Sequence, residues 1–228
     1  MEPTRAAVSG PAETSSIPAE VLARLSAEAS RYLAQAATVL EAVAGTEGAR
    51  VGEVSALLAE RLRRGGTLFT CGNGGSAADA QHVAAELSGK FFLSRPGLAA
   101  VALTTNTSAL TAIANDFSYD EVFERQLSGL ARPGDVLMAF TTSGRSPSIR
   151  RACEWARGHE VTTVAFVGSP GREWAKTCDY AFVVPSDVTP HIQQAHITLG
   201  HAICALAEAD LFGPHGRPPE TAAGAGRP

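Results

Sequence analysis

A chain of 228 residues, 45% of them hydrophobic and 18% charged, has the length and apolar content of one globular domain with extensions. Its formal net charge of −4 and the lack of a dense Lys/Arg block argue against a nucleic-acid-binding surface. No apolar run approaches the roughly 20 residues that span a bilayer, and the first residues lack the apolar core of a signal peptide, so we expect a cytoplasmic protein with no membrane or nucleic-acid partner.

Both ends of the chain are predicted to be disordered. Residues 1–16 and 212–228 are rich in Pro, Ala, Gly and Thr, and such segments cannot bury enough apolar surface to offset the entropy of ordering. We therefore expect a single folded domain over residues 17–211. It should begin with two helices, because apolar residues recur at helical spacing over 21–43 and again over 51–62, where a pair of glycines follows.

The pattern then changes to short β-prone runs that are apolar at both odd and even positions, which is typical of strands covered on both faces. The runs are 67–72, 99–104, 135–142, 162–168 and 180–185. Helix-like segments separate them, and a final helix is expected over about 191–210. This order predicts an α/β fold, a three-layer sandwich with a five-stranded parallel sheet between helices.

A glycine-rich turn follows the first strand and contains Asn73, Gly74, Gly75 and Ser76. Ligands of open parallel sheets bind beyond the carboxyl ends of the strands. Glycines let the backbone approach a ligand, and Ser76 could cap a helix whose N–H groups attract anions. Neither GxGxxG nor the Walker pattern is present, so the turn indicates a phosphate, although a tight turn with a serine cap would look the same.

A second turn of this kind follows the third strand and leads into a helix that begins near Pro147. Its hydroxyl-bearing residues are Thr141, Thr142, Ser143 and Ser146. Hydroxyls and backbone amides can hold a phosphate without a fixed positive charge, but a hydroxyl-rich helix cap is the alternative. Two such turns at one edge of a sheet favour a single phosphorylated ligand.

Polar residues also share helix faces. Asp79, His82 and Glu86 are spaced by three and four, which places them on one face. His82 and Glu86 could bind a metal or act as an acid–base pair, whereas a solvated face would show the same spacing. The final helix adds Gln193, His196 and His201, and either histidine could instead be a buried structural one.

Four blocks of sequence resemble the bacterial phosphoheptose isomerases, a family of SIS-domain enzymes. They are CGNGGSAADAQHVAAELSGKF, TAIANDFSYDEVFERQL, GDVLMAFTTSGRSPSIRRA and IQQAHITLGHAICAL, within a match over roughly residues 20–211. The resemblance implies the SIS fold and conversion of D-sedoheptulose 7-phosphate into D-glycero-D-manno-heptose 7-phosphate. It further implies a homotetramer with active sites between subunits and one zinc ion per subunit.

The resemblance also implies residue roles. Glu86 would be the general base that moves a proton between C1 and C2 through an enediol(ate), with His201 as the partner acid/base. The zinc ligands would be His82, Glu86, Gln193 and His201. Substrate contacts would come from Asn73, Gly74, Gly75, Ser76, Thr141, Thr142, Ser143, Ser146 and Gln193, with Asn115 and Asp116 on sugar hydroxyls and Asp79 in support.

Two implied ligands are hard to reconcile on a straight helix. Gln193 and His201 are eight residues apart, which corresponds to about 12 Å of rise. Either Gln193 lies before the regular helix, or the two serve different subunits, or only one binds zinc.

Two alternatives to this function remain open from the sequence. One is the non-catalytic SIS protein that binds the replication initiator DnaA, which resembles the chain at TAIAND but lacks the acid and the histidine at the positions of Glu86 and His201. The other is a SIS isomerase acting on a different sugar phosphate.

Overall fold

The computed structural model describes residues 17–213, and the two predicted disordered tails lie outside these residues except for positions 212 and 213. Five parallel strands form one sheet in the order β2-β1-β3-β4-β5. The strands are β1 (Leu68–Gly72), β2 (Ala100–Ala102), β3 (Val136–Phe140), β4 (Thr162–Gly168) and β5 (Tyr180–Val184). The predicted five-stranded parallel sheet is therefore confirmed.

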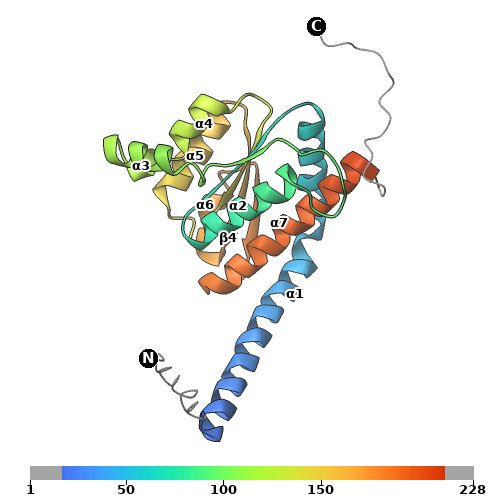
Figure 1. Ribbon diagram of the computed structural model, residues 1–228, viewed down its shortest axis with the longest axis vertical. Helices are drawn as coiled ribbons and strands as arrows, with labels where there is room; N and C mark the ends of the chain where they lie inside the picture. Colours follow the sequence, from blue (N-terminus) through green and yellow to red (C-terminus); the bar gives the residue numbers. More distant parts are fainter. Residues whose placement is uncertain (1–16, 214–228) are drawn as a thin grey trace, which may run out of the picture.

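Helices cover both faces of the sheet and complete the predicted three layers (Figure 1). One face packs against α1 (Ala19–Arg63), α2 (Gly75–Ser88) and α7 (Thr189–Phe212). The other packs against α3 (Thr107–Asp116), α4 (Glu124–Leu130), α5 (Pro147–Gly158) and α6 (Arg172–Ala175), with 3₁₀ turns at η1 (Tyr119–Glu121) and η2 (Ser169–Gly171). None of the described helices has both the length and the apolar character needed to cross a bilayer.

The central strands bury side chains on both faces, as their sequence predicts. In β3, Met138 and Phe140 pack toward α2 and α7, whereas Leu137 and Ala139 pack toward α5. All four are 0% exposed. This two-sided burial explains why the strand reads as a continuous apolar run.

The N-terminal region differs from the prediction, because it forms one continuous 45-residue helix in place of two. Gly45, Gly48 and Gly52 all lie inside α1, and each costs roughly 1 kcal/mol relative to alanine in a helix. Packing of the C-terminal half of α1 along α7 offsets this cost (Figure 1). The helix α7 ends at Phe212, one residue beyond the predicted end of the domain, and Phe212 is buried.

Candidate active site

The glycine turn joins β1 to α2 at the carboxyl edge of the sheet. Gly74 is the N-cap of α2 and has a φ of 56°, a value that favours glycine. No side chain caps this helix, so the expectation that Ser76 caps it is wrong. Ser76 is instead buried in the first turn, where its backbone oxygen approaches Gly72 so closely that a Cβ would clash.

We expect Gly72→Ala to destabilise the fold by about 1–3 kcal/mol, because the added methyl must displace backbone of α2 rather than a flexible side chain. Urea unfolding measures the change. The matched control is Gly52→Ala in α1, where nothing lies within 4 Å of the new methyl, and which should raise the unfolding free energy by about 0.5–1 kcal/mol. Equal stabilities for the two variants would contradict the close approach.

The second predicted turn lies beside the first. Gly72 pairs with Phe140 in the parallel register of β1 and β3, so both strands end at the same level. The turn passes Thr142, whose carbonyl accepts a 2.9 Å hydrogen bond from the Gly168 N–H, and enters α5 at Pro147, as predicted. The side chain of Ser146, the N-cap of α5, makes no capping bond, which leaves its hydroxyl available to a ligand.

A side-chain bridge joins the two turns. The Asn73 amide donates to the Ser148 hydroxyl on α5 at 3.1 Å, and its oxygen accepts from the Tyr119 hydroxyl in η1 at 2.8 Å. The two contacts fix which way the amide of Asn73 faces. Sequence reasoning missed Ser148 and Tyr119, and only their positions next to predicted site segments could have suggested them.

Three of the predicted chemical residues converge between α2 and α7. His82 Nε2 lies 2.9 Å from Glu86 Oε1 and 3.4 Å from His201 Nε2. The rings of His82 and His201 meet edge to face, with centroids 4.8 Å apart. The side chain of His82 is 50% exposed and that of Glu86 is 20% exposed, so the cluster is open to a ligand.

The surroundings of the cluster shift two pKa values. Burial, and then the nearby His82, lower the pKa of His201, although Glu86 raises it. His201 is therefore neutral at pH 7 and has a free lone pair to offer. Burial raises the pKa of Asp79 to about 6, against the opposing effect of His82. Its buried Oδ2 has no hydrogen-bond partner among the described residues.

The donor set fits a divalent transition metal. One ligand atom from each of His82, Glu86 and His201 lies within 4.8 Å of the others. A tetrahedral zinc with 2.0–2.1 Å bonds to imidazole places its ligand atoms about 3.3 Å apart, which is close to the 3.4 Å between the two histidine nitrogens. Two imidazoles and one carboxylate are also the protein ligands in one class of catalytic zinc site.

Gln193 lies within the regular helix α7, which removes the first of the three explanations for its spacing from His201. Its side-chain amide occupies the space next to Gly75, where a Cβ would clash with it. The amide therefore lies at the start of α2, two turns before His82. This is a position for a substrate contact, and its role as a metal ligand stays a prediction.

Asn115 and Asp116 are the last two residues of α3 and are not part of the cluster of His82, Glu86 and His201. Both are exposed, and the Asn115 amide donates to the Asp116 carboxylate at 2.8 Å. Their predicted contact with sugar hydroxyls is untested.

His196 is the buried structural histidine that the sequence left as an alternative. It is 0% exposed among Phe140 and Phe166, and neither ring nitrogen has a hydrogen-bond partner among the described residues. Burial lowers the pKa of His196 to about 4. The ring is therefore neutral in the fold.

We expect His196 to make the fold acid-sensitive. The folded pKa of His196, about 4, lies below its unfolded value near 6.5. The contribution of this residue to the free energy of unfolding is therefore complete above pH 6.5 and is lost as the pH falls toward 4. The loss amounts to about 3 kcal/mol. Urea unfolding of the wild type and of His196→Leu between pH 7.5 and 4.5 measures this loss, because the free energy of unfolding should fall more steeply with decreasing pH in the wild type than in the variant. Parallel pH dependences would contradict it.

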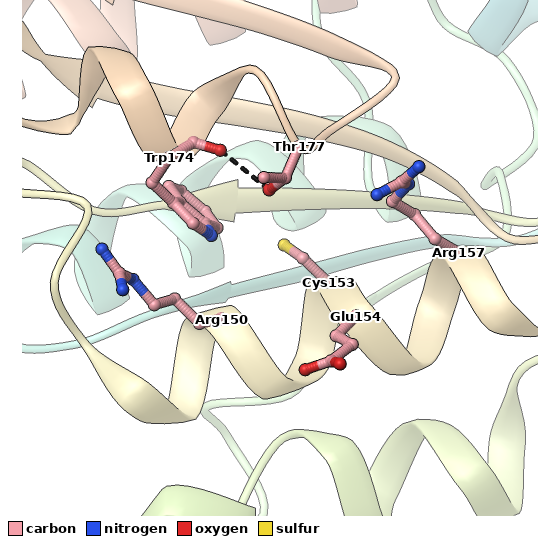
Figure 2. A pocket seen from close by; sticks show the side chains of 6 residues that line it. All are labelled: Arg150, Cys153, Glu154, Arg157, Trp174 and Thr177. Atoms are coloured by element: carbon pink, nitrogen blue, oxygen red, sulfur yellow. Dashed lines mark hydrogen bonds between the residues drawn. The ribbon is translucent and has the colours of Figure 1, made fainter.

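A cavity of about 360 Å³ between α5 and α6 contains none of the predicted site residues (Figure 2). Its walls include Arg150, Arg157 and Trp174, and the Cys153 thiol points into it. The candidate active site is thus an open surface between α2 and α7 and is separate from this cavity.

Comparison with known proteins identifies the family. Residues 31–168 match the SIS domain family. A phosphoheptose isomerase of Bradyrhizobium sp. (strain BTAi1) is 52% identical over 72% of this chain and 83% of its own length, and one of Bradyrhizobium sp. (strain ORS 278) is 48% identical over 80% and 93%. The structure of phosphoheptose isomerase GmhA from Neisseria gonorrhoeae superposes with a TM-score of 0.76 at 37% identity, covering 81% of this chain and 99% of that one. The chain therefore belongs to the phosphoheptose isomerase family of SIS-domain proteins.

Proposed function

We propose that this chain is an aldose–ketose isomerase that converts D-sedoheptulose 7-phosphate into D-glycero-D-manno-heptose 7-phosphate. The observation that carries the proposal is the proximity of the Glu86 carboxylate and the His201 imidazole, whose ligand atoms lie within 4.8 Å of each other. The relatives of this chain that bear the name phosphoheptose isomerase support it. The presence of this carboxylate and this imidazole argues against the DnaA-binding alternative, which lacks both side chains at these positions.

The reaction moves one proton between carbons and one between oxygens. Glu86 takes a proton from C1 of the ketose and returns it to C2, with an enediol(ate) between the two steps. His201, neutral at pH 7 because burial lowers its pKa, carries the proton between O2 and O1. Each positioned acid or base contributes about 10²–10⁴-fold to the rate of such a step.

The phosphate belongs at the two turns. Backbone N–H groups at the starts of α2 and α5 attract an anion, and the Ser146 hydroxyl and Gln193 amide lie at these helix starts. His82 lies about two turns and Glu86 about three turns past Gly75, so the proton-transfer groups are on the helix that the glycine turn begins.

The metal proposed for the cluster is zinc, one per subunit, held by His82, Glu86 and His201, with Gln193 as the fourth predicted ligand. Bound there, it would act as a Lewis acid toward the sugar oxygens.

The proposed assembly is a cytoplasmic homotetramer with active sites between subunits. The N-terminal half of α1 extends away from the domain (Figure 1), and it exposes Leu22, Leu25 and Leu33 at 55%, 48% and 65%. An exposed apolar stripe of this kind favours packing against another chain. The exposure of His82 likewise favours a site that a second subunit completes.

The test is incubation of the purified chain with sedoheptulose 7-phosphate, following the aldose product, before and after chelation and zinc restoration. We expect turnover that chelation removes and zinc restores. Equal turnover of arabinose 5-phosphate, or full activity after complete metal removal, would favour a different SIS isomerase. No aldose from any ketose phosphate would overturn the proposal.

A further inference from the structure

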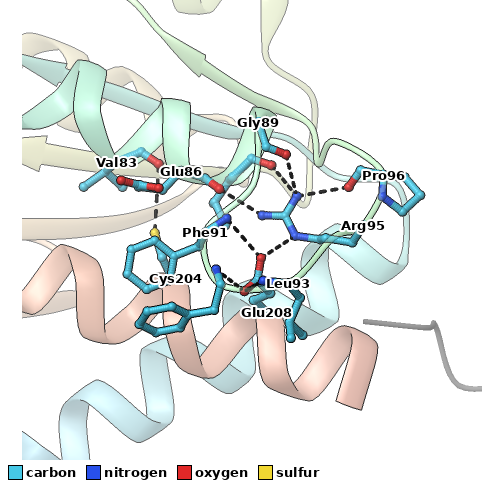
Figure 3. A network of polar contacts seen from close by, with 11 residues as sticks. Val83, Glu86, Gly89, Phe91, Leu93, Arg95, Pro96, Cys204 and Glu208 are labelled. Atoms are coloured by element: carbon cyan, nitrogen blue, oxygen red, sulfur yellow. Dashed lines mark hydrogen bonds and ion pairs between the residues drawn. The ribbon is translucent and has the colours of Figure 1, made fainter. Parts of the chain in front are cut away.

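A buried ion pair lies beside the C-terminal end of α2 and bonds to the backbone of Glu86 (Figure 3). Arg95, in the segment after α2, and Glu208, on α7, are joined by a 2.7 Å bond, and their side chains are 0% and 1% exposed. A buried pair of this kind needs further hydrogen bonds to offset the loss of hydration. Both partners have them, and these bonds link the pair to the active-site elements.

Glu208 holds the segment after α2. Its carboxylate accepts hydrogen bonds from the backbone N–H groups of Phe91, Phe92 and Leu93, at 3.2, 2.8 and 3.0 Å. Burial alone would raise the pKa of Glu208, but these N–H groups and Arg95 outweigh it and lower the pKa. The carboxylate is therefore charged at neutral pH, and both of its oxygens are fully engaged.

Arg95 holds the end of α2. Its guanidinium donates to the carbonyl oxygens of Glu86 at 2.9 Å, Leu87 at 2.8 Å and Gly89 at 3.3 Å. These are among the last carbonyls of the helix, which lack partners within it and favour a cation. One of them belongs to the backbone of the proposed general base itself.

The Arg95–Glu208 pair is also connected to His201, the proposed partner acid/base, in two ways. Glu208 lies two turns after His201 on the same face of α7. The segment that it holds also carries Phe91, whose ring lies 5.6 Å from the His201 ring. Between the two helices Gly200 allows close approach, because a Cβ there would lie 2.6 Å from Val83 Cγ2.

From this arrangement we infer that Glu208 and Arg95 are positioning residues for the isomerase reaction, which set the distance between the Glu86 carboxylate and the His201 imidazole. The inference rests on the proposed function. It assigns the pair no contact with substrate. The glycine turn lies at the opposite end of α2 and the second turn at the start of α5, so loss of the pair should affect the proton-transfer step and spare substrate binding.

The experiment is steady-state kinetics of the zinc-loaded, full-length chain with sedoheptulose 7-phosphate. E208Q replaces one carboxylate oxygen by an NH2 group that cannot accept hydrogen bonds. A displacement of about 1 Å between reacting groups costs on the order of 100-fold, so we expect kcat to fall about 100-fold while KM stays within about threefold. The matched control is Asp210→Asn, on α7 like Glu208, which breaks an exposed ion pair with Arg63 at the end of α1 and should leave kcat unchanged.

Arg95→Lys provides a second variant if E208Q does not fold. It keeps the charge but loses the fork that binds the carbonyls, and it should also lower kcat at constant KM. Phe91→Leu leaves every backbone bond in place and should lower kcat by a smaller factor. Folded E208Q or Arg95→Lys protein with kcat within twofold of wild type would overturn the inference. Absence of turnover in the wild type would instead contradict the proposed function.

Discussion

Glu86→Gln is expected to abolish isomerisation, with kcat reduced about 10³-fold, because an amide cannot accept the C1 proton. The backbone of this residue should stay in place, since Arg95 bonds to its carbonyl and not to its side chain. Coupled assay of aldose formation measures the loss, and thermal unfolding checks that the fold is intact.

The matched control for this variant is Glu154→Gln, which makes the same change at an exposed position on α5. It should retain wild-type kcat and KM. Glu86→Gln protein that is folded and turns over within about tenfold of wild type would remove Glu86 from the mechanism.

His201→Ala is expected to lower kcat about 10²-fold or more and also to reduce the zinc content of the purified protein. Two functions are lost together, because the imidazole is both the proposed proton carrier between the oxygens and a proposed metal ligand. Measuring turnover and metal content on the same sample tests both. His159→Ala removes an exposed histidine at the end of α5 and should change neither.

The two His201→Ala readouts separate the roles. Normal zinc content with a large loss of kcat would contradict the ligand role alone. Normal turnover would contradict the catalytic role.

Much of the fold was predictable from local pattern. The sequence runs that form β1, β3, β4 and β5 are apolar at both odd and even positions because helices cover these strands on both faces. The edge strand β2 is shorter than predicted and only partly buried. The break expected within α1 did not occur, because packing on α7 outweighs the cost of three internal glycines.

The residues of the candidate site could largely be predicted from the sequence, but the contacts that position them could not. The spacing of His82 and Glu86 placed them on one face, and the family resemblance named His201 with them. The structure brings His201 from α7 to within 3.4 Å of His82. Ser76 as a helix cap was wrong, because the positive φ at Gly74 moves the cap two residues earlier.

The supporting contacts could not be predicted because they join distant parts of the chain. Asn73 and Tyr119 are 46 residues apart, and Arg95 and Glu208 are 113 apart. Such pairs leave no periodic signal in one sequence.

The central claim is that Glu86 breaks the C1–H bond of the ketose phosphate. Its most direct test is NMR in D2O of sedoheptulose 7-phosphate with wild type and with Glu86→Gln, counting aldose formed plus deuterium incorporated at C1 or C2. We predict rapid C–H cleavage with the wild type and none above the enzyme-free rate with Glu86→Gln. Cleavage by folded Glu86→Gln at the wild-type rate would contradict the account.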